Sequence, residues 1–420
     1  MNKRAFIRSM GALAIPFNTK AWGQQAWLEW AKNVPAKDLA KVDAYWAGIR
    51  GKYELHFDFI NLESGYYNII PQSTLEKYFT HIREVNRLGA YYMRTVQHEN
   101  KRKVKEKLAK LLDCPSDEMI ITRNTTESLD MIIGGYPWQK EDEAIYSYQD
   151  YGAMQDMFEQ SSRRFGIVNK RVSIPNHPKN DEELVQVYAE AITPKTRLIM
   201  IPHIVNITGQ IMPVRKICDM AHAKGVEVMV DGAHAVAHFQ FSMKELDCDY
   251  YGSSLHKWLA APLGAGILFI KKRNIEKIWP LLAESARASG SVMRLNHVGT
   301  HPVATDLTIA DAIDFYQEIG PANKEERLRY LQNYWTSKVR HLPNIVLNTP
   351  EDPKRSCAIA NVGIKHMEPQ KLAEILLSKY KIFTVAINTK NVNGCRITPN
   401  VFTTTDELDK FVTALQELAS

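Results

Sequence analysis

The chain has 420 residues, of which 45% are hydrophobic and 24% are charged, and its formal net charge is +6. This length and composition are typical of a globular protein that buries a large core in one or two domains. The densest basic run, residues 101–110 (KRKVKEKLAK), has helical spacing, so it indicates a solvated helix face and not a nucleic-acid-binding surface. The five cysteines are scattered without a CxxC spacing and predict neither a disulfide framework nor a metal site.

The N-terminus has the pattern of an export signal. A basic cluster at 3–8 precedes an apolar run at 10–17, and the small residues Ala21 and Gly23 precede a cleavage point. The stretch KRAFI resembles a twin-arginine signal in which lysine replaces the first arginine. We therefore predict a signal peptide over 1–23 and a periplasmic protein, with a cytoplasmic protein as the alternative. No later segment reaches the roughly 18 uninterrupted apolar residues of a membrane span, so we expect no integral membrane segment.

Short β-rich runs alternate with amphipathic helical runs, such as 181–192 and 214–224, from about residue 115 to 272. This alternation predicts an α/β fold in which helices cover both faces of a mainly parallel sheet. Residues before about 95 are expected to build either a small lobe or the mouth of a ligand site. The predicted strands are EMIITR (118–123), EAIYSY (143–148), RLIMIPH (197–203), VEVMVDG (226–232), YYGSS (250–254) and AGILFIK (265–271).

The pattern changes in the last quarter of the chain. Helices are expected over 306–319 and 322–340, followed by shorter strands and a terminal helix near 403–415. Thr405, with the two acidic residues that follow it, is the expected cap of this last helix. The predicted organisation is a signal peptide (1–23), an N-terminal helical segment (24–54), a large domain (55–302) and a small α+β domain (303–420).

Three features stand at the ends of predicted strands, where open α/β sheets place their ligands. In TRNTTESLDMII a strand ends and a helix opens at Thr125 and Thr126, whose N–H groups and hydroxyls suit a phosphate. An ordinary helix cap with threonine at the cap position fits the same residues. Asp231 ends a strand so apolar that its carboxylate needs a cationic or hydrogen-bonding partner. Lys257, in YYGSSLHKWLAAPLG, lies among residues that are expected to be interior.

A phosphate cradle, a buried acid and a buried lysine at one sheet edge suit one cofactor, pyridoxal 5′-phosphate (PLP). Asp231 would keep the pyridine nitrogen protonated, and Lys257 would form an imine with the aldehyde. Burial would lower the pKa of the Lys257 amine and make it reactive. The alternative, from the residues alone, is an α/β protein without this cofactor.

The ordered motifs HIVNITGQIMPV, VDGAHA, DYYGSSLHKWL and PLGAGILF resemble the class V aminotransferase family of fold-type I PLP enzymes. This family includes cysteine desulfurases and an isopenicillin N epimerase-like branch, and the resemblance extends over residues 55–420. It implies that Lys257 is the Schiff-base lysine and that Asp231 is the partner of the pyridine nitrogen. The other cofactor-binding residues that it implies are Thr125, Thr126, Tyr151, Asn206, His234, Ser254, His256 and Thr300.

The resemblance also implies how substrate and partner subunit are bound. Arg396, in GCRITPNVFTTTDEL, matches an arginine that binds the substrate α-carboxylate, and a guanidinium suits this role because it pairs bidentately with carboxylates. A structural salt bridge is the alternative for Arg396. Asn206 and Tyr66 are expected beside the substrate. Thr300, in the GTH segment, matches a threonine that reaches the phosphate of the neighbouring subunit, so a homodimer is implied.

The expected reaction begins at Cα of an amino acid or of a metabolite that contains one. A cysteine desulfurase needs a mobile cysteine, but KYKIFTVAIN contains none and Cys395 is expected on a strand. GYYNIIPQ and RITPNVFTT favour the epimerase-like branch, so we predict an epimerase or an aminotransferase in which Lys257 is the base. A lyase that breaks a C–S or another β or γ bond and a catalytically idle PLP-binding relative are the alternatives. The candidates for the second acid of an epimerase are Tyr151, Tyr66, Tyr67 and His301.

Overall fold

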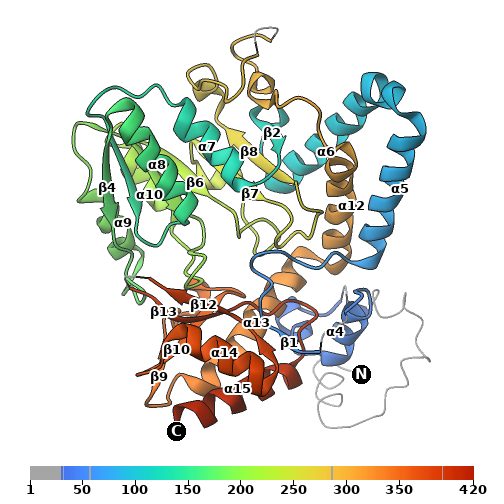
Figure 1. Ribbon diagram of the computed structural model, residues 1–420, viewed down its shortest axis with the longest axis vertical. Coiled ribbons are helices and arrows are strands. Elements are labelled where there is room, and N and C mark those ends of the chain that lie inside the picture. The colour runs from blue at the N-terminus through green and yellow to red at the C-terminus, as the bar shows by residue number, and fades with distance from the viewer. Residues whose placement is uncertain (1–29, 32, 56–57, 285–286, 390) are drawn as a thin grey trace.

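The computed structural model describes residues 30, 31, 33–55, 58–284, 287–389 and 391–420. The predicted signal peptide and the first residues of the predicted helical segment lie outside this part of the chain. The described residues form two lobes, one above the other in Figure 1. The large lobe surrounds a seven-stranded sheet, and the small lobe is built chiefly from the C-terminal residues. The domain limits at 55 and 303 stay predictions.

The sheet of the large lobe is mainly parallel and has the strand order β2-β8-β7-β6-β5-β3-β4. β8 runs antiparallel to both of its neighbours, whereas the pairs from β7 to β4 are parallel. β2 therefore points the same way as β7, and its C-terminal end meets the same edge of the sheet. The strands are β2 (Met119–Thr122), β3 (Glu143–Ser147), β4 (Val168–Val172), β5 (Thr196–Pro202), β6 (Glu227–Asp231), β7 (Tyr250–Ser254) and β8 (Gly266–Ile270).

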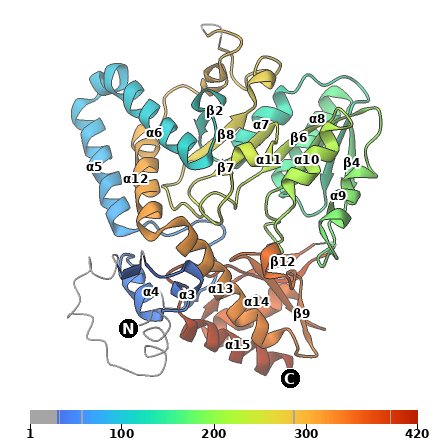
Figure 2. The ribbon, with the colours of Figure 1, turned by 180° about the vertical axis from the view of Figure 1, so that it is seen from behind.

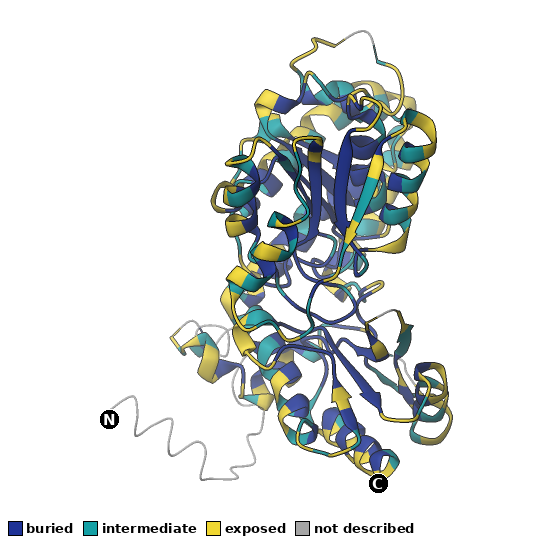
Figure 3. Ribbon diagram, turned by 90° about the vertical axis from the view of Figure 1, so that its left-hand side faces the viewer, coloured by how far each residue is buried: buried dark blue, intermediate teal, exposed yellow. Residues whose placement is uncertain are grey.

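Two hydrophobic cores lie on the two faces of this sheet because successive residues of a strand point to opposite sides. Met200 and Met229 belong to the core under α7 and α8, whereas Ile201 and Val230 belong to the core under α6, α9 and α10. Figure 3 shows the buried sheet between helices whose outer faces are exposed. The predicted α/β architecture is confirmed. These helices are α6 (Gln97–Leu112), α7 (Thr125–Gly135), α8 (Gly152–Phe165), α9 (Asp181–Ala189) and α10 (Val214–His222).

Six strands of the sheet match their predicted ranges within one residue at each end. β4 was not predicted. Its sequence, VNKRV, lies at the edge of the sheet and is exposed or half-buried throughout, so it lacks the apolar run that marks the buried strands.

Long helices from the N-terminal third pack beside the sheet. α5 and α6 lie next to α12, as Figures 1 and 2 show from opposite sides. One link between them is the ion pair of Lys101 with Asp306, at 2.7 Å. The two short helices α3 and α4 lie beside the small lobe instead. The bounds are α3 (Ala36–Leu39), α4 (Asp43–Arg50), α5 (Gln72–Leu88) and α12 (Val303–Ile319).

The small lobe has a four-stranded antiparallel sheet of order β12-β13-β10-β9, packed against α13, α14 and α15. β1, from the N-terminal part of the chain, pairs in parallel with β11, so residues near 60 join the C-terminal lobe in space. The elements are β1 (Ile60–Asn61), β9 (Ile345–Leu347), β10 (Ala360–Ile364), β11 (Ile382–Phe383), β12 (Val385–Asn388), β13 (Asn393–Ile397), α13 (Pro321–Val339), α14 (Pro369–Tyr380) and α15 (Thr405–Ala419).

The cap of α15 is Thr404, so the prediction of Thr405 is wrong by one residue. Thr404 has the extended backbone of a cap, and its hydroxyl accepts a hydrogen bond from Glu407 N at 3.1 Å. The Glu407 side chain accepts in return from Thr404 N at 2.8 Å, which completes a capping box.

Short helical elements complete the described chain: η1 (Tyr92–Val96), η2 (Ser116–Glu118), α11 (Met243–Leu246), η3 (Lys272–Asn274), η4 (Val292–Asn296) and η5 (Pro353–Arg355). Within the described ranges, no helix is long and apolar enough to cross a membrane. In the same residues, no group of three or more His, Cys, Asp or Glu side chains is arranged to hold a metal ion.

Candidate active site

The ends of β6 and β7 bring the predicted acid and the predicted lysine to one edge of the sheet. Asp231 is the last residue of β6, and Lys257 follows Ser254, the last residue of β7. The two strands are parallel neighbours, with Asp231 opposite Gly252. Asp231 is buried, and its carboxyl group and the Lys257 amine are close enough for each charge to shift the pKa of the other.

The Lys257 amine is paired with a buried histidine. Lys257 Nζ lies 3.1 Å from His234 Nε2, and Trp258 Nε1 donates to Nδ1 of the same ring at 3.3 Å. Because an indole N–H only donates, Nδ1 is an acceptor and a neutral His234 carries its proton on Nε2. When the Lys257 amine is neutral, Nε2–H donates to the lone pair of Nζ. Burial lowers the pKa of Lys257 to about 8, which makes the neutral amine more accessible than in an ordinary lysine, and it lowers the pKa of His234 well below its usual value.

Asp231 is fixed by the backbone that follows it. Its Oδ1 accepts a hydrogen bond from Ala233 N at 2.9 Å, and burial raises the pKa of its carboxyl group above the usual value. Gly232 allows the chain to pass close to Tyr251, because a Cβ at Gly232 would lie 2.1 Å from that ring. The Tyr251 hydroxyl is in turn 2.9 Å from His203 Nδ1. The carboxylate therefore extends from a tightly packed strand end.

The first turn of α7 lies against the end of β7. Thr125 N donates to Ser254 Oγ at 2.9 Å, and the two hydroxyl oxygens are 2.7 Å apart. Asn124, and not a threonine, is the helix cap, because its extended backbone lets its side chain accept from Glu127 N at 2.9 Å. Thr126 lies in the first turn, where backbone N–H groups lack carbonyl partners within the helix.

Near this turn, His256 has a buried ring nitrogen, Nδ1, without a hydrogen-bond partner in the described part of the chain. Burial lowers the pKa of His256 to about 4, so the ring is neutral at pH 7. The backbone carbonyl of His256 accepts from Asn68 N at 3.1 Å, which ties the loop that carries Lys257 to the N-terminal part of the chain.

The predicted carboxylate clamp, Arg396, is engaged by a glutamate of its own chain. Arg396 Nη2 donates to Glu63 Oε1 at 2.6 Å and Nε donates to Glu63 Oε2 at 3.2 Å, while Nη1 donates to the Asn206 carbonyl at 3.4 Å. Arg396 is 7% exposed and Glu63 is 9% exposed. The charge of Arg396 also contributes to lowering the pKa values of Lys257 and His234, so the guanidinium lies near the amine. The salt bridge that was the alternative for Arg396 is present, and the clamp stays a prediction.

Two predicted aromatic residues stand on exposed connections. Tyr151, which directly precedes α8, is 50% exposed, and Tyr66 is 76% exposed. Tyr66 N donates to Glu63 Oε1 at 2.9 Å, which places Tyr66 beside the Arg396 pair. Exposed aromatic rings of this kind are available to stack on a flat ligand.

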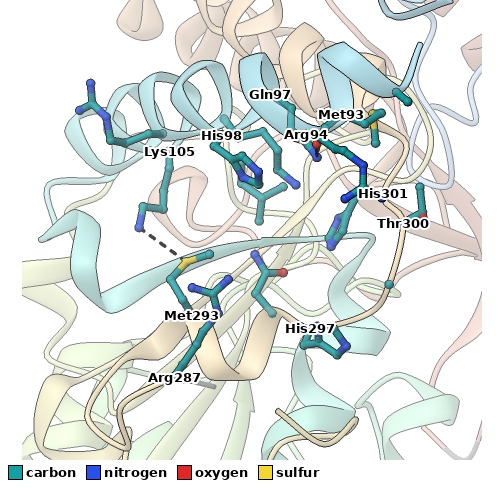
Figure 4. Close-up of a pocket in the computed structure, with 16 residues that line it drawn as sticks. Met93, Arg94, Gln97, His98, Lys105, Arg287, Met293, His297, Thr300 and His301 are labelled. Carbon is teal, nitrogen blue, oxygen red and sulfur yellow. Dashed lines mark hydrogen bonds between the residues drawn. The ribbon is translucent and has the colours of Figure 1, made fainter. Parts of the chain in front are cut away.

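Thr300 lies apart from these groups, in a cavity of about 740 Å³. Neither Lys257 nor Asp231 lines this cavity. Figure 4 shows its basic character, with positively charged side chains from η1, α6 and the loop before Thr300 around one space. These side chains are Arg94, Lys101, Arg102, Lys105 and Arg287.

Two contributions to the site were not predicted. Glu63 meets Arg396 across 333 residues of sequence, and no local pattern links the two segments. Trp258 lies within the lysine motif, but its role as the donor that sets the His234 tautomer depends on a side-chain contact that the sequence does not specify.

A family model described as aminotransferase class-V matches residues 70–389, which is more than half of the chain. The chain belongs to this family. Isopenicillin N epimerase from Streptomyces clavuligerus is 27% identical to this class V protein over 395 residues, which cover 89% of the chain and 98% of the epimerase. A probable cysteine desulfurase from Halalkalibacterium halodurans is 24% identical, over 72% of the chain and 76% of the desulfurase.

Solved structures share the fold of this class V protein. The cystine C-S lyase C-DES in complex with cysteine persulfide has a TM-score of 0.77 at 20% identity, over 85% of this chain and 97% of the lyase. The cysteine desulfurase CsdA from Escherichia coli has a TM-score of 0.76 at 22% identity, over 89% of this chain and 98% of that one. The fold is therefore fold-type I, as predicted, and the protein is a PLP-dependent enzyme.

The residues at the sheet edge fit this cofactor. A neutral amine suits the attachment of an aldehyde, and a buried acid suits a protonated ring nitrogen. The backbone N–H of Thr126 in the first turn of α7, the hydroxyls of Thr125 and Ser254, and the unpartnered His256 Nδ1 are groups that suit a phosphate. We call Asp231, His234, Ser254, His256 and Lys257 the strand-end cluster. The individual roles of its members stay predictions.

Proposed function

We propose that this class V enzyme removes and returns the Cα proton of an amino acid, or of a metabolite that contains one, as an epimerase or an aminotransferase. The observation that supports this most strongly is the Lys257 amine, which His234 Nε2–H approaches to 3.1 Å at the edge shared with Asp231. In its neutral form, which a pKa of about 8 makes more accessible than in an ordinary lysine, this amine is both a nucleophile toward an aldehyde and a base toward a Cα proton.

When it is bound, PLP supplies an electron-withdrawing ring that stabilises the negative charge left at Cα. Lys257 would hold the cofactor through Nζ and, once a substrate amine has displaced it, would take the Cα proton. His234 would orient the lone pair of Nζ, and Asp231 would keep the ring nitrogen protonated. Tyr151 would cover one face of the ring. The phosphate would be held by Thr125, Thr126, Ser254 and His256.

The substrate would be oriented by the small lobe. Arg396 would bind the α-carboxylate, with Asn206 and Tyr66 beside it, so that the Cα–H bond faces Lys257. For an epimerase, an acid on the opposite face must return the proton. The candidates are Tyr66, Tyr67, Tyr151 and His301, of which Tyr66 lies beside the Arg396 pair.

The cysteines argue against a sulfur-accepting role. Cys395 is buried in the core of the small lobe on the opposite side of β13 from Arg396, and burial raises the pKa of its thiol to about 11. Burial likewise raises the thiol pKa of each of the other four, which are Cys114, Cys218, Cys248 and Cys357. The thiolate that a persulfide-forming enzyme needs is therefore disfavoured at all five.

A β- or γ-lyase that releases its sulfur product into solution is the second candidate. It needs the same base and no cysteine, and the buried thiols of this chain favour it over a cysteine desulfurase.

A screen of amino acids and short peptides with the holoenzyme in deuterated water tests these proposals. Deuterium at Cα with inverted configuration indicates an epimerase, and a keto acid with pyridoxamine phosphate indicates an aminotransferase. Sulfide, pyruvate or ammonia indicates a lyase. The absence of Cα exchange with every compound would contradict all three and indicate a catalytically idle relative.

Thr300 and its basic cavity support a homodimer, which we also propose. In a single chain, a large cavity lined by positively charged side chains surrounds Thr300, which the family resemblance places at the phosphate of a neighbouring subunit. The cofactor phosphate of a second copy would complement this charge. Sedimentation velocity of the holoenzyme is expected to give twice the mass of the chain, and Thr300→Ala is expected to weaken PLP retention. A holoenzyme that stays monomeric would contradict the proposal.

The KRAFI stretch and the small residues before position 24 support export as a folded protein. We expect the mature chain in the periplasmic fraction of an expressing bacterium. Arg4→Gln, which removes the remaining arginine of the pair, is expected to retain the protein in the cytoplasm. Equal distribution of both variants would support the cytoplasmic alternative.

A further inference from the structure

Glu63 and Arg396, the clamp pair, form a buried ion pair of defined geometry. Glu63 takes the side of the guanidinium that carries Nε and Nη2, and the Asn206 carbonyl takes one N–H of Nη1. A guanidinium has five N–H donors. In the described part of the chain, these contacts engage three of them and leave one on Nη1 and one on Nη2. A substrate carboxylate can accept from these remaining donors.

Glu63 is held in place by the backbone on both sides. Thr398 N donates to the Leu62 carbonyl at 2.8 Å, and Ser64 N donates to the Thr398 hydroxyl at 2.7 Å. Tyr66 N donates to Glu63 Oε1, which also fixes the side chain. These contacts are made by a segment that pairs with the small lobe, so Glu63 is a fixed partner of Arg396.

Gly65 allows this segment to close over the guanidinium. A Cβ at Gly65 would lie 3.3 Å from Arg396 Cζ and 3.2 Å from Thr398 Cγ2. Three residues later, Asn68 N reaches the carbonyl of His256. The same short segment therefore connects Arg396 to the loop that carries Lys257.

We propose that Glu63 is a positioning residue for the substrate: it holds the guanidinium of Arg396 so that the remaining N–H groups on Nη1 and Nη2 receive the substrate α-carboxylate. This inference rests on the proposed function, in which Arg396 binds that carboxylate. Glu63 also balances the charge of Arg396 at the reacting amine, because Arg396 lowers the pKa of Lys257 whereas Glu63 raises it.

The test is Glu63→Ala in the holoenzyme, with the best substrate from the amino-acid screen. Loss of two charge-assisted hydrogen bonds to the guanidinium is expected to raise KM about 10- to 100-fold. The value of kcat is expected to change much less, because Lys257 and Asp231 are untouched. The PLP absorbance band reports that the variant is folded and loaded.

Acetate rescue distinguishes positioning from a merely structural role. Glu63→Ala removes a fragment of the size of acetate, so added acetate is expected to bind beside Arg396 and lower the raised KM. In the wild-type enzyme, acetate is expected only to compete with the substrate. If acetate inhibits Glu63→Ala as it inhibits the wild type, or if KM falls on substitution because Glu63 only obstructs Arg396, the proposal is wrong.

Two further variants keep the test decisive. Glu63→Gln preserves the side-chain length and is the replacement if Glu63→Ala does not fold; its KM is expected to rise, but less. Arg396→Lys removes the bidentate donor itself and is expected to raise KM more than either. If Arg396→Lys leaves KM unchanged, the proposed substrate clamp fails. If Arg396→Lys raises KM and both Glu63 variants do not, only the role of Glu63 fails.

Discussion

The strand-end cluster and the clamp pair are two charged regions of one site, and they differ in how completely they are paired. In the strand-end cluster, Lys257 Nζ meets only the weakly basic His234, Asp231 accepts from a single backbone N–H, and His256 Nδ1 has no partner within the described residues. In the clamp pair, Arg396 has a bidentate carboxylate and a backbone carbonyl. Incomplete pairing at the strand ends indicates groups that a ligand completes, whereas the bidentate pairing of Arg396 holds its guanidinium in position and leaves two N–H groups for a ligand.

The largest expected effect on activity follows from removing the Lys257 amine, which has fewer hydrogen-bond partners than Arg396. Lys257→Ala is expected to reduce Cα deuterium exchange by about 10²- to 10⁴-fold, because the base is lost. It is also expected to prevent borohydride from linking PLP to the protein, as read by mass spectrometry. Exchange at the wild-type rate would show that another residue is the base.

Lys324 provides the matched control for Lys257. It is also buried, and burial lowers its pKa to about 7, but its amine donates to the Trp258 carbonyl. Lys324→Met is expected to change stability and to leave borohydride linkage of PLP at Lys257 intact. If Lys324→Met also abolished the linkage, reactivity toward PLP would not be specific to the position of Lys257.

A smaller loss is expected from the acid of the cluster. Asp231→Asn keeps the shape and removes the charge, so exchange is expected to fall by about 10²- to 10³-fold, which is typical when one group that stabilises a developing charge is lost.

Asp150→Asn is the control. Burial raises the pKa of Asp150 to about 8, so its carboxyl group is mainly protonated at pH 7 and an amide resembles it. The rates of Cα deuterium exchange are measured at saturating PLP. If Asp231→Asn and Asp150→Asn reduce this rate to a similar extent, Asp231 has no special role.

The stability of the apoenzyme tests the comparison directly. The folded-state pKa of Lys257 lies below the usual value of 10.5, so the unfolded chain binds a proton that the folded chain lacks between about pH 8 and 10.5. Stability rises with pH through this window, and the penalty is complete below pH 8. Lys257→Met is therefore expected to increase the free energy of unfolding at pH 7 by up to about 3 kcal/mol, with the gain vanishing above pH 10.5.

Whereas Lys257→Met is expected to stabilise the apoenzyme, breaking the clamp pair is expected to destabilise it. Glu63→Ala leaves a buried guanidinium without its counter-ion and is expected to lower the free energy of unfolding of the apoenzyme by about 3 to 5 kcal/mol. Urea denaturation of the two apo variants beside the wild type provides the measurement. Destabilisation by both substitutions would show that the two regions are held by the same kind of pairing.

The smallest effect is expected at Cys395, next to Arg396 in sequence but on the other face of β13. Cys395→Ser is expected to leave kcat and KM unchanged, because the thiol lies in the core of the small lobe. A loss of sulfide production with retained Cα exchange would instead identify it as a sulfur acceptor.

The sequence predicts the buried half of this fold well and its surface poorly. The strands that are buried on both faces are recognisable in the sequence as apolar runs. Asp231 and Lys257 are recognisable because each is a charged residue at the end of such a run or just after it. β4 at the sheet edge has no such pattern, and α5 and α6 have polar faces that could be assigned to either lobe from sequence alone.

The residues of the candidate site that belong to one strand end or one sequence motif were predictable. The predicted residues at the ends of β6 and β7 gather at one edge because parallel neighbouring strands end together. The pairing of Glu63 with Arg396 was not predictable, because it depends on β1 returning to the C-terminal lobe as the partner of β11. The proposed role of Thr300 depends on a second chain, so neither the sequence of one copy nor its fold decides it.

The return of the segment around Glu63 to the last strand of the small lobe has a consequence for biosynthesis. A nascent chain that has emerged from the ribosome as far as Lys257 already contains the lysine and the acid, yet Glu63 still lacks the arginine that it must neutralise. The site therefore closes only when translation is almost finished. A chain that terminates before residue 396 is therefore left with a carboxylate at Glu63 that has no arginine to pair with.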